Sequence, residues 1–304
     1  MAPLPMINSE KQRLKTMHKT KPFTLKKLVL ALAIAGYTMG SAYAVLTLPT
    51  GTIQGTAPVL SAPSNSALHA VDLSSSAVGA TLATGDTITL TYDYADTDGD
   101  ADASTAHVNW YFVNSGVDTP ITAVVNTPST AGGTGTSVMT LPATALGADA
   151  IKVVIQEYSA TGDPVAGSTI TIDDTNVGGG GTTTPPGPIA PGAGVTAGIY
   201  LSTDTTFTTN LIGSATNLSV GNSYVFKLWD STAVGTSDLT SNVTYNWRLV
   251  GTSATTGTSA PATGFVTSVT DGNFTVPTNT QPDGTALTGS ADGAQGFNLA
   301  VDYN

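Results

Sequence analysis

Apolar and polar residues alternate along several short stretches of the chain, and clusters of turn residues separate these stretches. In residues 87–92 apolar side chains alternate with threonines, and the same period of two recurs in residues 150–155 and 297–303. Alternation of β-branched and aromatic residues is typical of half-buried strands. Asp-Gly and Thr-Gly-Asp turns recur at short intervals, so the pattern predicts an all-β fold.

The strand pattern occurs twice. Gly85 opens one copy and Trp110 follows 25 residues later, whereas Gly221 and Trp247 stand 26 residues apart in the other. In both copies an asparagine directly precedes the tryptophan. A buried tryptophan on the third core strand is typical of the immunoglobulin plan, here without its disulfide. The sequence therefore predicts two immunoglobulin-like β-sandwich domains in tandem.

A stretch rich in glycine and proline, residues 178–194, reads GGGGTTTPPGPIAPGAG. Glycine supplies flexibility and proline supplies extension, so we expect a linker in which no core forms. The linker separates two domains of ordinary size, 66–177 and 195–304. Residues 45–65 are polar and rich in turn residues, and we expect a lead-in segment there with one short strand.

The N-terminal residues 1–44 have the three zones of a secretory signal peptide. A basic stretch from Lys11 to Lys27 precedes an apolar run from Leu28 to Met39, and an Ala-Tyr-Ala cleavage site ends at Ala44. The alternative is a transmembrane anchor, but the apolar run is shorter than the roughly 20 residues that spanning requires. We therefore expect a cleaved signal peptide and an exported protein.

Charge and composition exclude several classes of function. After residue 44 the chain keeps 3 of its 10 basic and 20 of its 21 acidic residues, a formal charge of −17. Such a chain repels the phosphates of nucleic acids and anionic membranes. It has no cysteine, which excludes disulfides, thiol nucleophiles and cysteine metal sites. No stretch after the signal is apolar enough for a transmembrane helix.

One loop gathers acidic residues in the sequence YDYADTDGDADAS, namely Asp93, Asp96, Asp98, Asp100 and Asp102. Carboxylates at alternate positions are the hard oxygen ligands that calcium accepts, so these five are candidate calcium ligands. The loop is not an EF-hand, because its glycine stands at the fourth position rather than the sixth. The alternative is a solvated acidic loop without an ion. No other cofactor is indicated.

Catalytic motifs are not visible. The serines lie in no Gly-x-Ser-x-Gly elbow, and His69 and His107 lack the spacing of a zinc site. Glu157 is the only glutamate after the signal, so a carboxylate pair for glycoside hydrolysis would rest mainly on aspartates. We predict no catalytic residue and a protein that is not an enzyme.

The three tryptophans are candidate sugar-stacking platforms. The matched positions of Trp110 and Trp247 favour core packing instead. Trp229 follows an alternating stretch and has no counterpart in the first copy, which makes it the best candidate for an exposed aromatic residue, although core packing is favoured there too.

The long basic leader, the GYTMGSAYA cleavage region, the paired tryptophan-centred modules and the Gly/Pro linker together resemble a group of secreted enterobacterial proteins. These are the SinI family of autotransporter-associated proteins and the similar exported ZirS and ZirU proteins, encoded beside intimin/invasin-like inverse autotransporters. The resemblance implies immunoglobulin-like domains and export via the periplasm of a Gram-negative bacterium, with release to the outer cell surface or the medium through a partner outer-membrane barrel. It supplies no catalytic residues.

Together these observations lead us to expect a non-enzymatic, adhesin-type binding protein that is secreted or surface-associated. Its expected partners are an intimin/invasin-like outer-membrane protein and a host or bacterial surface molecule. The alternative is a structural spacer or subunit of a surface fibre, which would self-associate. An extracellular glycan hydrolase is the third interpretation.

Overall fold

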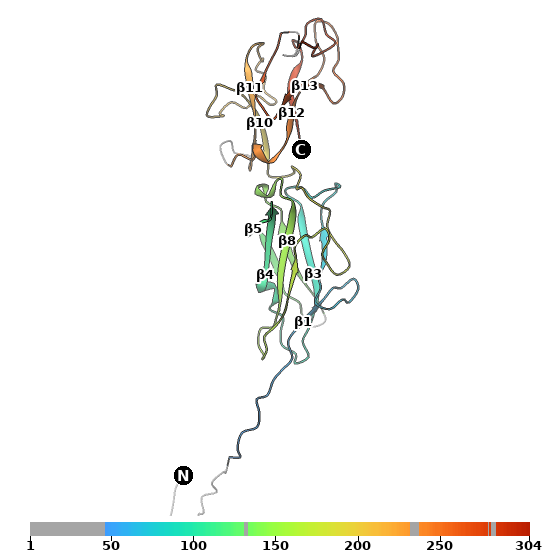
Figure 1. Cartoon of the computed structure of the whole chain (residues 1–304), viewed down its shortest axis with the longest axis vertical. Helices are drawn as coiled ribbons and strands as arrows, with labels where there is room; N and C mark the ends of the chain where they lie inside the picture. Colours follow the sequence, from blue (N-terminus) through green and yellow to red (C-terminus); the bar gives the residue numbers. More distant parts are fainter. Residues whose placement is uncertain (1–45, 131–132, 232–236, 279, 281–283) are drawn as a thin grey trace, which may run out of the picture. The chain divides into compact units, whose positions relative to one another are not determined.

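The computed structural model describes residues 46–130, 133–231, 237–278, 280 and 284–304 (Figure 1). The expected signal peptide, residues 1–44, lies outside this part of the chain. The described residues form antiparallel strands joined by loops and three short 3₁₀ turns, which confirms the all-β prediction. Within the same residues, no helix has the length and apolarity needed to cross a membrane.

The first sandwich begins with a sheet built around β3 (Thr87–Ala95). Two short strands, β1 (Val59–Ser61) and β2 (Asp72–Ser75), both pair with one edge of β3. On the other edge follow β7 (Thr134–Thr140) and β6 (Val124–Thr127). β1 is the short strand expected in the lead-in segment.

The second sheet of this sandwich has the order β5, β4, β8, β9. Its strands are β5 (Val117–Ile121), β4 (Val108–Asn114), β8 (Ala150–Tyr158) and β9 (Ala166–Ile172), and every neighbouring pair is antiparallel. A 3₁₀ turn, η1 (Ser104–His107), leads into β4, and another, η2 (Ala143–Ala145), lies between β7 and β8.

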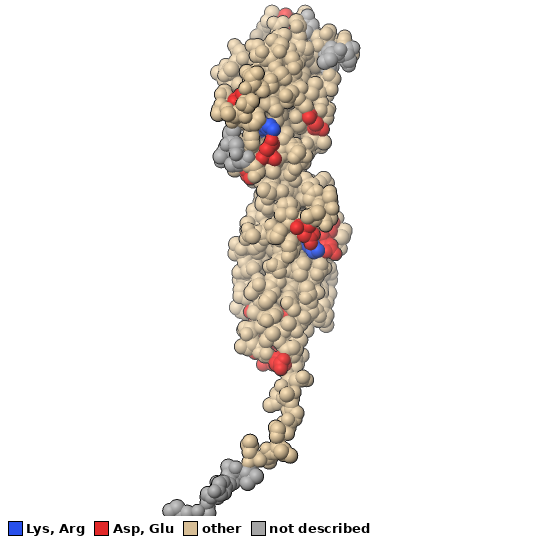
Figure 2. All heavy atoms as spheres, turned by 60° about the vertical axis from the view of Figure 1, so that its left-hand side comes forward, with Lys and Arg blue, Asp and Glu red and all other residues tan. Residues whose placement is uncertain are grey.

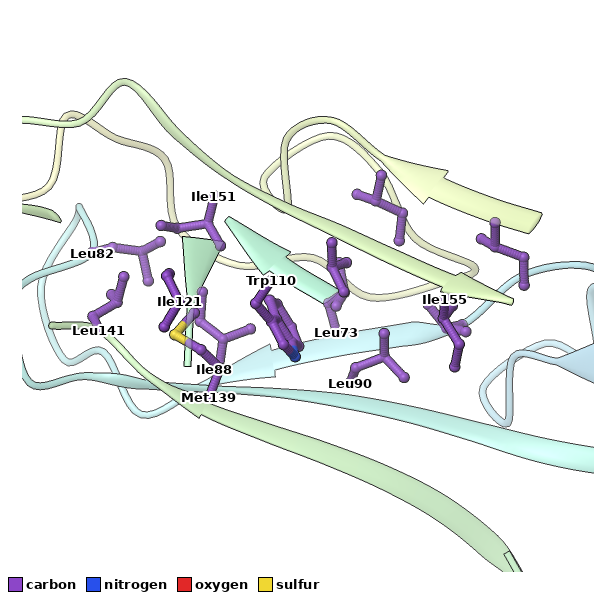
Figure 3. Packing of buried hydrophobic residues seen from close by; sticks show 14 of the residues in the cluster. Leu73, Leu82, Ile88, Leu90, Trp110, Ile121, Met139, Leu141, Ile151 and Ile155 are labelled. Carbon is purple, nitrogen blue, oxygen red and sulfur yellow. The ribbon is translucent and has the colours of Figure 1, made fainter. Parts of the chain in front are cut away.

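Apolar side chains from both sheets meet in one core (Figure 3). The alternating residues of β3 and β8 point inward, as the period of two predicts. Trp110 of β4 lies among them and is only 1% exposed, which confirms that it is a core residue. The chief contributors are Ile88, Leu90, Tyr92, Met139, Ile151, Val153 and Ile155.

The Gly/Pro segment 178–194 is not the flexible, coreless linker that its composition indicates. Ile189 is 2% exposed and belongs to the first core. Backbone hydrogen bonds attach the segment along its length: Gly180 to Val71, Leu73 to Thr182, Leu82 to both Pro186 and Ala190, and Ile189 to Ala148. These bonds satisfy backbone groups that neighbouring elements leave unpaired, so the segment is an ordered part of the first sandwich.

Two three-stranded sheets form the second sandwich. One has the order β10 (Thr196–Leu201), β11 (Ser223–Trp229), β14 (Phe274–Thr275). The other has the order β13 (Phe265–Thr270), β12 (Tyr245–Val250), β15 (Asn298–Tyr303), and a 3₁₀ turn, η3 (Thr240–Asn242), precedes β12. Their shared core includes Phe226, Trp247, Leu249 and Phe274, so Trp247 is also a core residue.

Residues 46–52 form a separate unit from Ile53–Asn304. They are extended, without regular secondary structure, and every described residue among them is exposed. The apolar side chains of Leu46 and Leu48 are 93% and 90% exposed.

Candidate functional site

The loop between β3 and η1 brings together three of the five candidate calcium ligands. Carboxylate oxygens of Asp96, Asp98 and Asp100 all lie within 4.8 Å of one another. Three carboxylates offer part of the six to eight oxygens that calcium takes. The loop is thus a candidate cation site with an incomplete set of protein ligands.

Donors within the protein already engage these carboxylates. Asp96 Oδ1 accepts the backbone N–H groups of Asp98 and Gly99 at 2.8 and 3.1 Å, which holds the loop in a tight turn. The side chain of Asp98 accepts the backbone N–H of Thr56, and Asp100 accepts the hydroxyl of Thr161. The acidic loop therefore ties the lead-in segment and the β8–β9 turn to the end of β3.

The other two candidates lie apart from this cluster. Asp93 accepts the Thr134 hydroxyl at 3.2 Å across the β3–β7 pair. Asp102 accepts the Tyr92 hydroxyl at 2.6 Å and the backbone N–H groups of Ser104 and Ser129. Burial, followed by the hydrogen bond to Asp102, raises the pKa of Tyr92 far above its ordinary value. Through these hydrogen bonds Asp102 has a structural role in the first sandwich.

The histidines take structural positions. His107 stacks on the ring of Tyr158, with 3.9 Å between the ring centroids. The Nδ1 atom of His69 lies 2.8 Å from Oε1 of the fully buried Glu157. Glu157 also accepts the backbone N–H groups of Leu60 in β1 and Ser168 in β9. This carboxylate joins the first and last strands of the sandwich, which belong to different sheets.

Trp229 is buried, with 4% of its surface exposed. Its indole N–H donates to the Tyr200 hydroxyl at 3.2 Å, and Phe207 packs against its ring. The hypothesis that this side chain offers an exposed platform for sugar stacking is therefore wrong, because the ring completes an aromatic cluster of the second sandwich.

Charged side chains are sparse on the face drawn in Figure 2, where acidic residues form scattered groups and basic ones are few. Within the described residues, the three basic side chains each pair with aspartates: Lys152 with Asp118 and Asp173, Lys227 with Asp238, and Arg248 with Asp302.

A second candidate site lies at the outer edge of β15. Asn304 exchanges both backbone hydrogen bonds with Thr244, so the pairing alternates along β15 and residues 300 and 302 face β12. The backbone groups of Leu299, Val301 and Tyr303 consequently point to the opposite side. Within the described residues no strand pairs with that side.

The facing edge, that of β10, is covered. Asn210 Oδ1 accepts the backbone N–H of Ile199 at 3.1 Å, and its Nδ2 donates to the Ala197 carbonyl at 3.2 Å. The backbone N–H of Leu211 adds a bond of 2.8 Å to the Ile199 carbonyl. The Asn210 segment thus takes the place of a neighbouring strand, whereas β15 has no such cover in the described part of the chain.

A groove of about 1130 Å³ runs between these two edges. Its floor is apolar and includes Ile199 and Phe226 together with the partly buried side chains of Leu299, Val301 and Tyr303. Residues 211–220 line its rim. None of the described residues that line it carries a charge, although the chain as a whole is strongly acidic.

Sequence reasoning missed this groove. The alternation in residues 297–303 correctly predicts a strand, but the period of two does not say whether a neighbour covers each edge. Whether an edge is covered is decided by strand pairing, which depends on residues distant in sequence and leaves no local signal.

Comparison with known proteins gives no further guide: no family model matches the chain, and the curated proteins include no significant match.

Proposed function

We propose that this chain is a secreted or surface-associated binding protein, not an enzyme, and that it binds by adding a strand to the open edge of β15. The observation that carries the proposal is a backbone edge that no described strand pairs with, bordering an uncharged groove with an apolar floor. Strand addition uses both features, because main-chain hydrogen bonds give affinity and pockets for alternate side chains give specificity.

The two sandwiches are proposed to be immunoglobulin-like, and their strand order supports this. That plan places strands A, B, E and D in one sheet and C, F and G in the other, with C′ beside C in larger versions. In their order across each sheet, β1 and β2, β3, β7 and β6 take the places of A, B, E and D, and β5, β4, β8 and β9 those of C′, C, F and G.

The second sandwich follows the same order with one difference. β10, β11 and β14 take the places of A, B and E, and β13, β12 and β15 those of C′, C and F. In the first sandwich β9 lies beside β8 and contributes Ile170 and Ile172 to the core. The corresponding place beside β15 has no strand in the described residues, and the groove lies there.

The proposed partner is an intimin/invasin-like outer-membrane protein, and a host or bacterial surface molecule is a further proposed ligand. The N-terminal export pattern and the resemblance to autotransporter-associated proteins support this. The acidic surface fits such a setting, because it disfavours binding to nucleic acid and anionic lipid.

The experiment compares the tagged native chain with tagged V301P in co-purification with the intimin/invasin-like barrel protein encoded beside it. Proline at an edge position removes one outward N–H without breaking a bond to β12. We expect the native chain to reach the cell surface and capture the barrel protein, and V301P to lose the capture while it keeps its fold. A protein that stays alone in the periplasm would contradict the proposal.

The alternative role, a subunit of a surface fibre, is favoured by one specific observation. Residues 46–52 carry exposed leucines in an extended segment. Sedimentation tests this role, because a fibre subunit forms large assemblies of its own chain.

A further inference from the structure

We infer that residues 46–53 of a second copy of this chain occupy the groove beside β15, so that copies join head to tail. The inference rests on the proposed strand addition at β15 and names its occupant.

The segment has the chemistry that the groove requires. Leu46, Leu48 and Ile53 are 93%, 90% and 96% exposed, although such side chains are ordinarily buried. Residues 46–57 include no charged residue, and neither do the described residues that line the groove. An uncharged partner avoids the cost of burying a charge in a site that offers no opposite charge to pair with it.

The backbone of the segment suits an edge strand. Side chains and backbone groups both alternate along a strand, so Leu46 and Leu48 can point into the groove while their N–H and C=O groups face β15. Pro49 is out of phase with these leucines. Its missing N–H therefore falls on the side away from β15, which is where an edge strand tolerates proline.

The first sandwich illustrates how such a strand fills its place. There β9 pairs with β8 and directs Ile170 and Ile172, two positions apart, into the core. Leu46 and Leu48 have the same separation and comparable apolar bulk. The donated segment would supply to the second sandwich what β9 supplies to the first.

The reach of the segment favours a second copy over its own groove. Gly55 donates to the Asp163 carbonyl in the turn that follows β8, which fixes Gly55 at that end of the first sandwich. The chain continues into the second sandwich from the other end of the first one, where the backbone N–H of Ile189 donates to the Ala148 carbonyl just before β8 begins. β8 has 9 residues and measures about 30 Å. Residues 46–54 span about 30 Å at full extension, so their whole length would be used before the groove is reached.

Because the donor and the acceptor are different surfaces, the contact is heterologous and does not close on itself as a two-fold dimer would. Heterologous contacts generate rings or open filaments. Each copy offers one donor segment and one groove, so assembly extends copy by copy.

The test uses protein purified after export by the producing cell, studied by analytical ultracentrifugation over a range of concentrations. We expect the native chain to form a ladder of oligomers. A donor variant, L46D/L48D, and an acceptor variant, V301P, should each stay monomeric, with association weakened about tenfold or more, which equals about 1.4 kcal/mol. The matched control T47D adds a charge on the opposite face of the same segment and should assemble like the native chain.

Mixing the two defective variants supplies the sharper result. L46D/L48D retains a working groove and V301P retains a working donor, so the mixture should form one-to-one complexes and nothing larger. This outcome also demonstrates that both variants are folded. If urea unfolding shows that both variants are folded and the mixture still forms no complex, the inference is overturned.

A synthetic peptide of residues 45–54 separates the inference from the function on which it rests. The peptide should bind L46D/L48D and should not bind V301P. If the peptide binds neither, but V301P still loses capture of the barrel protein, strand addition stands and the self-derived occupant is overturned. If V301P changes neither capture nor assembly, strand addition at β15 itself fails. The inference is also overturned if the native chain is monomeric and does not bind the peptide, whereas L46D/L48D does bind it. That result would identify the chain's own segment as the occupant of its groove.

Discussion

Trp110 Nε1 donates a hydrogen bond of 2.9 Å to Ser137 Oγ, and this bond crosses from one sheet of the first sandwich to the other. Both residues are buried, so no water replaces the bond when either partner is changed. The matching tryptophan, Trp247, instead donates to the backbone carbonyl of Gly272 at 2.7 Å. The two sandwiches thus satisfy the same buried N–H by different means, and only the first is open to test by a side-chain change.

The S137A variant should destabilise the first sandwich by about 1–3 kcal/mol, because it leaves the indole N–H buried without an acceptor. The measurement is urea unfolding followed by tryptophan fluorescence. S168A, which removes the hydroxyl of an exposed serine on β9, should stay within about 0.5 kcal/mol of the native chain. Equal effects of the two changes would contradict the assigned role of the Trp110 bond.

Glu157 should be the most sensitive acidic residue of the first sandwich. E157A removes the acceptor of the buried backbone N–H of Leu60, which should cost about 1–3 kcal/mol, and also that of the part-buried N–H of Ser168. H69A should cost less, because the His69 side chain is 50% exposed and water can replace it. Thermal unfolding of the two variants provides the comparison, and a larger loss from H69A would refute this account.

The Gly/Pro segment should depend on Ile189 for its attachment. I189A empties a position in the first core and should cost about 2–5 kcal/mol. We also expect proteases to cut residues 178–194 faster in this variant than in the native chain. V177A, whose side chain is 77% exposed, is the control and should be cut at the native rate. Fast cutting of the native chain would mean that the segment is free.

Tyr92 should make the first sandwich sensitive to alkali. Burial, followed by the hydrogen bond to Asp102, raises the pKa of Tyr92, so the folded state keeps its proton when the unfolded state has lost it. Its contribution is complete below the ordinary tyrosine pKa of about 10 and falls as the pH rises above that value. Y92F should therefore lose stability less steeply than the native chain above pH 10, as measured by urea unfolding at a series of pH values. Y111F, at a partly exposed position on β4, should follow the native slope.

The calcium hypothesis makes a separate prediction for the acidic loop. An ion held by Asp96, Asp98 and Asp100 would relieve their mutual repulsion, so millimolar calcium should raise the Tm of the native chain. D98N/D100N should lose that rise, whereas D118N, at an aspartate on β5 outside the loop, should keep it. Identical melts of the native chain with and without calcium would leave the loop as a solvated acidic turn.

The sequence predicted those features that depend on local pattern. The period of two places β3, β8 and β15 correctly, because alternation follows from the geometry of a strand. The spacing from glycine to tryptophan likewise predicts that Trp110 and Trp247 are core residues, which their burial confirms.

Features that depend on residues distant in sequence could not be predicted from the local pattern. Glycine and proline in residues 178–194 indicate flexibility in an isolated peptide, but the partners that order the segment, such as Leu82 and Ala148, lie far away in sequence. Of the five candidate aspartates, only three share one site, because Asp93 belongs to β3 and Asp102 turns toward Tyr92. The open side of β15 depends on which strands pair, and no local pattern encodes that.

The ties at the start of the first sandwich also have a mechanical meaning. Tension applied through residues 46–52 would meet the Gly55–Asp163 bond first, then the Thr56–Asp98 bond, and then the bond from Leu60 to the buried Glu157. Only after these would the force reach β3 and the core. The entry of the chain is thus secured by three attachments in series, each deeper than the last, which suits a segment that carries a pull between one molecule and the next.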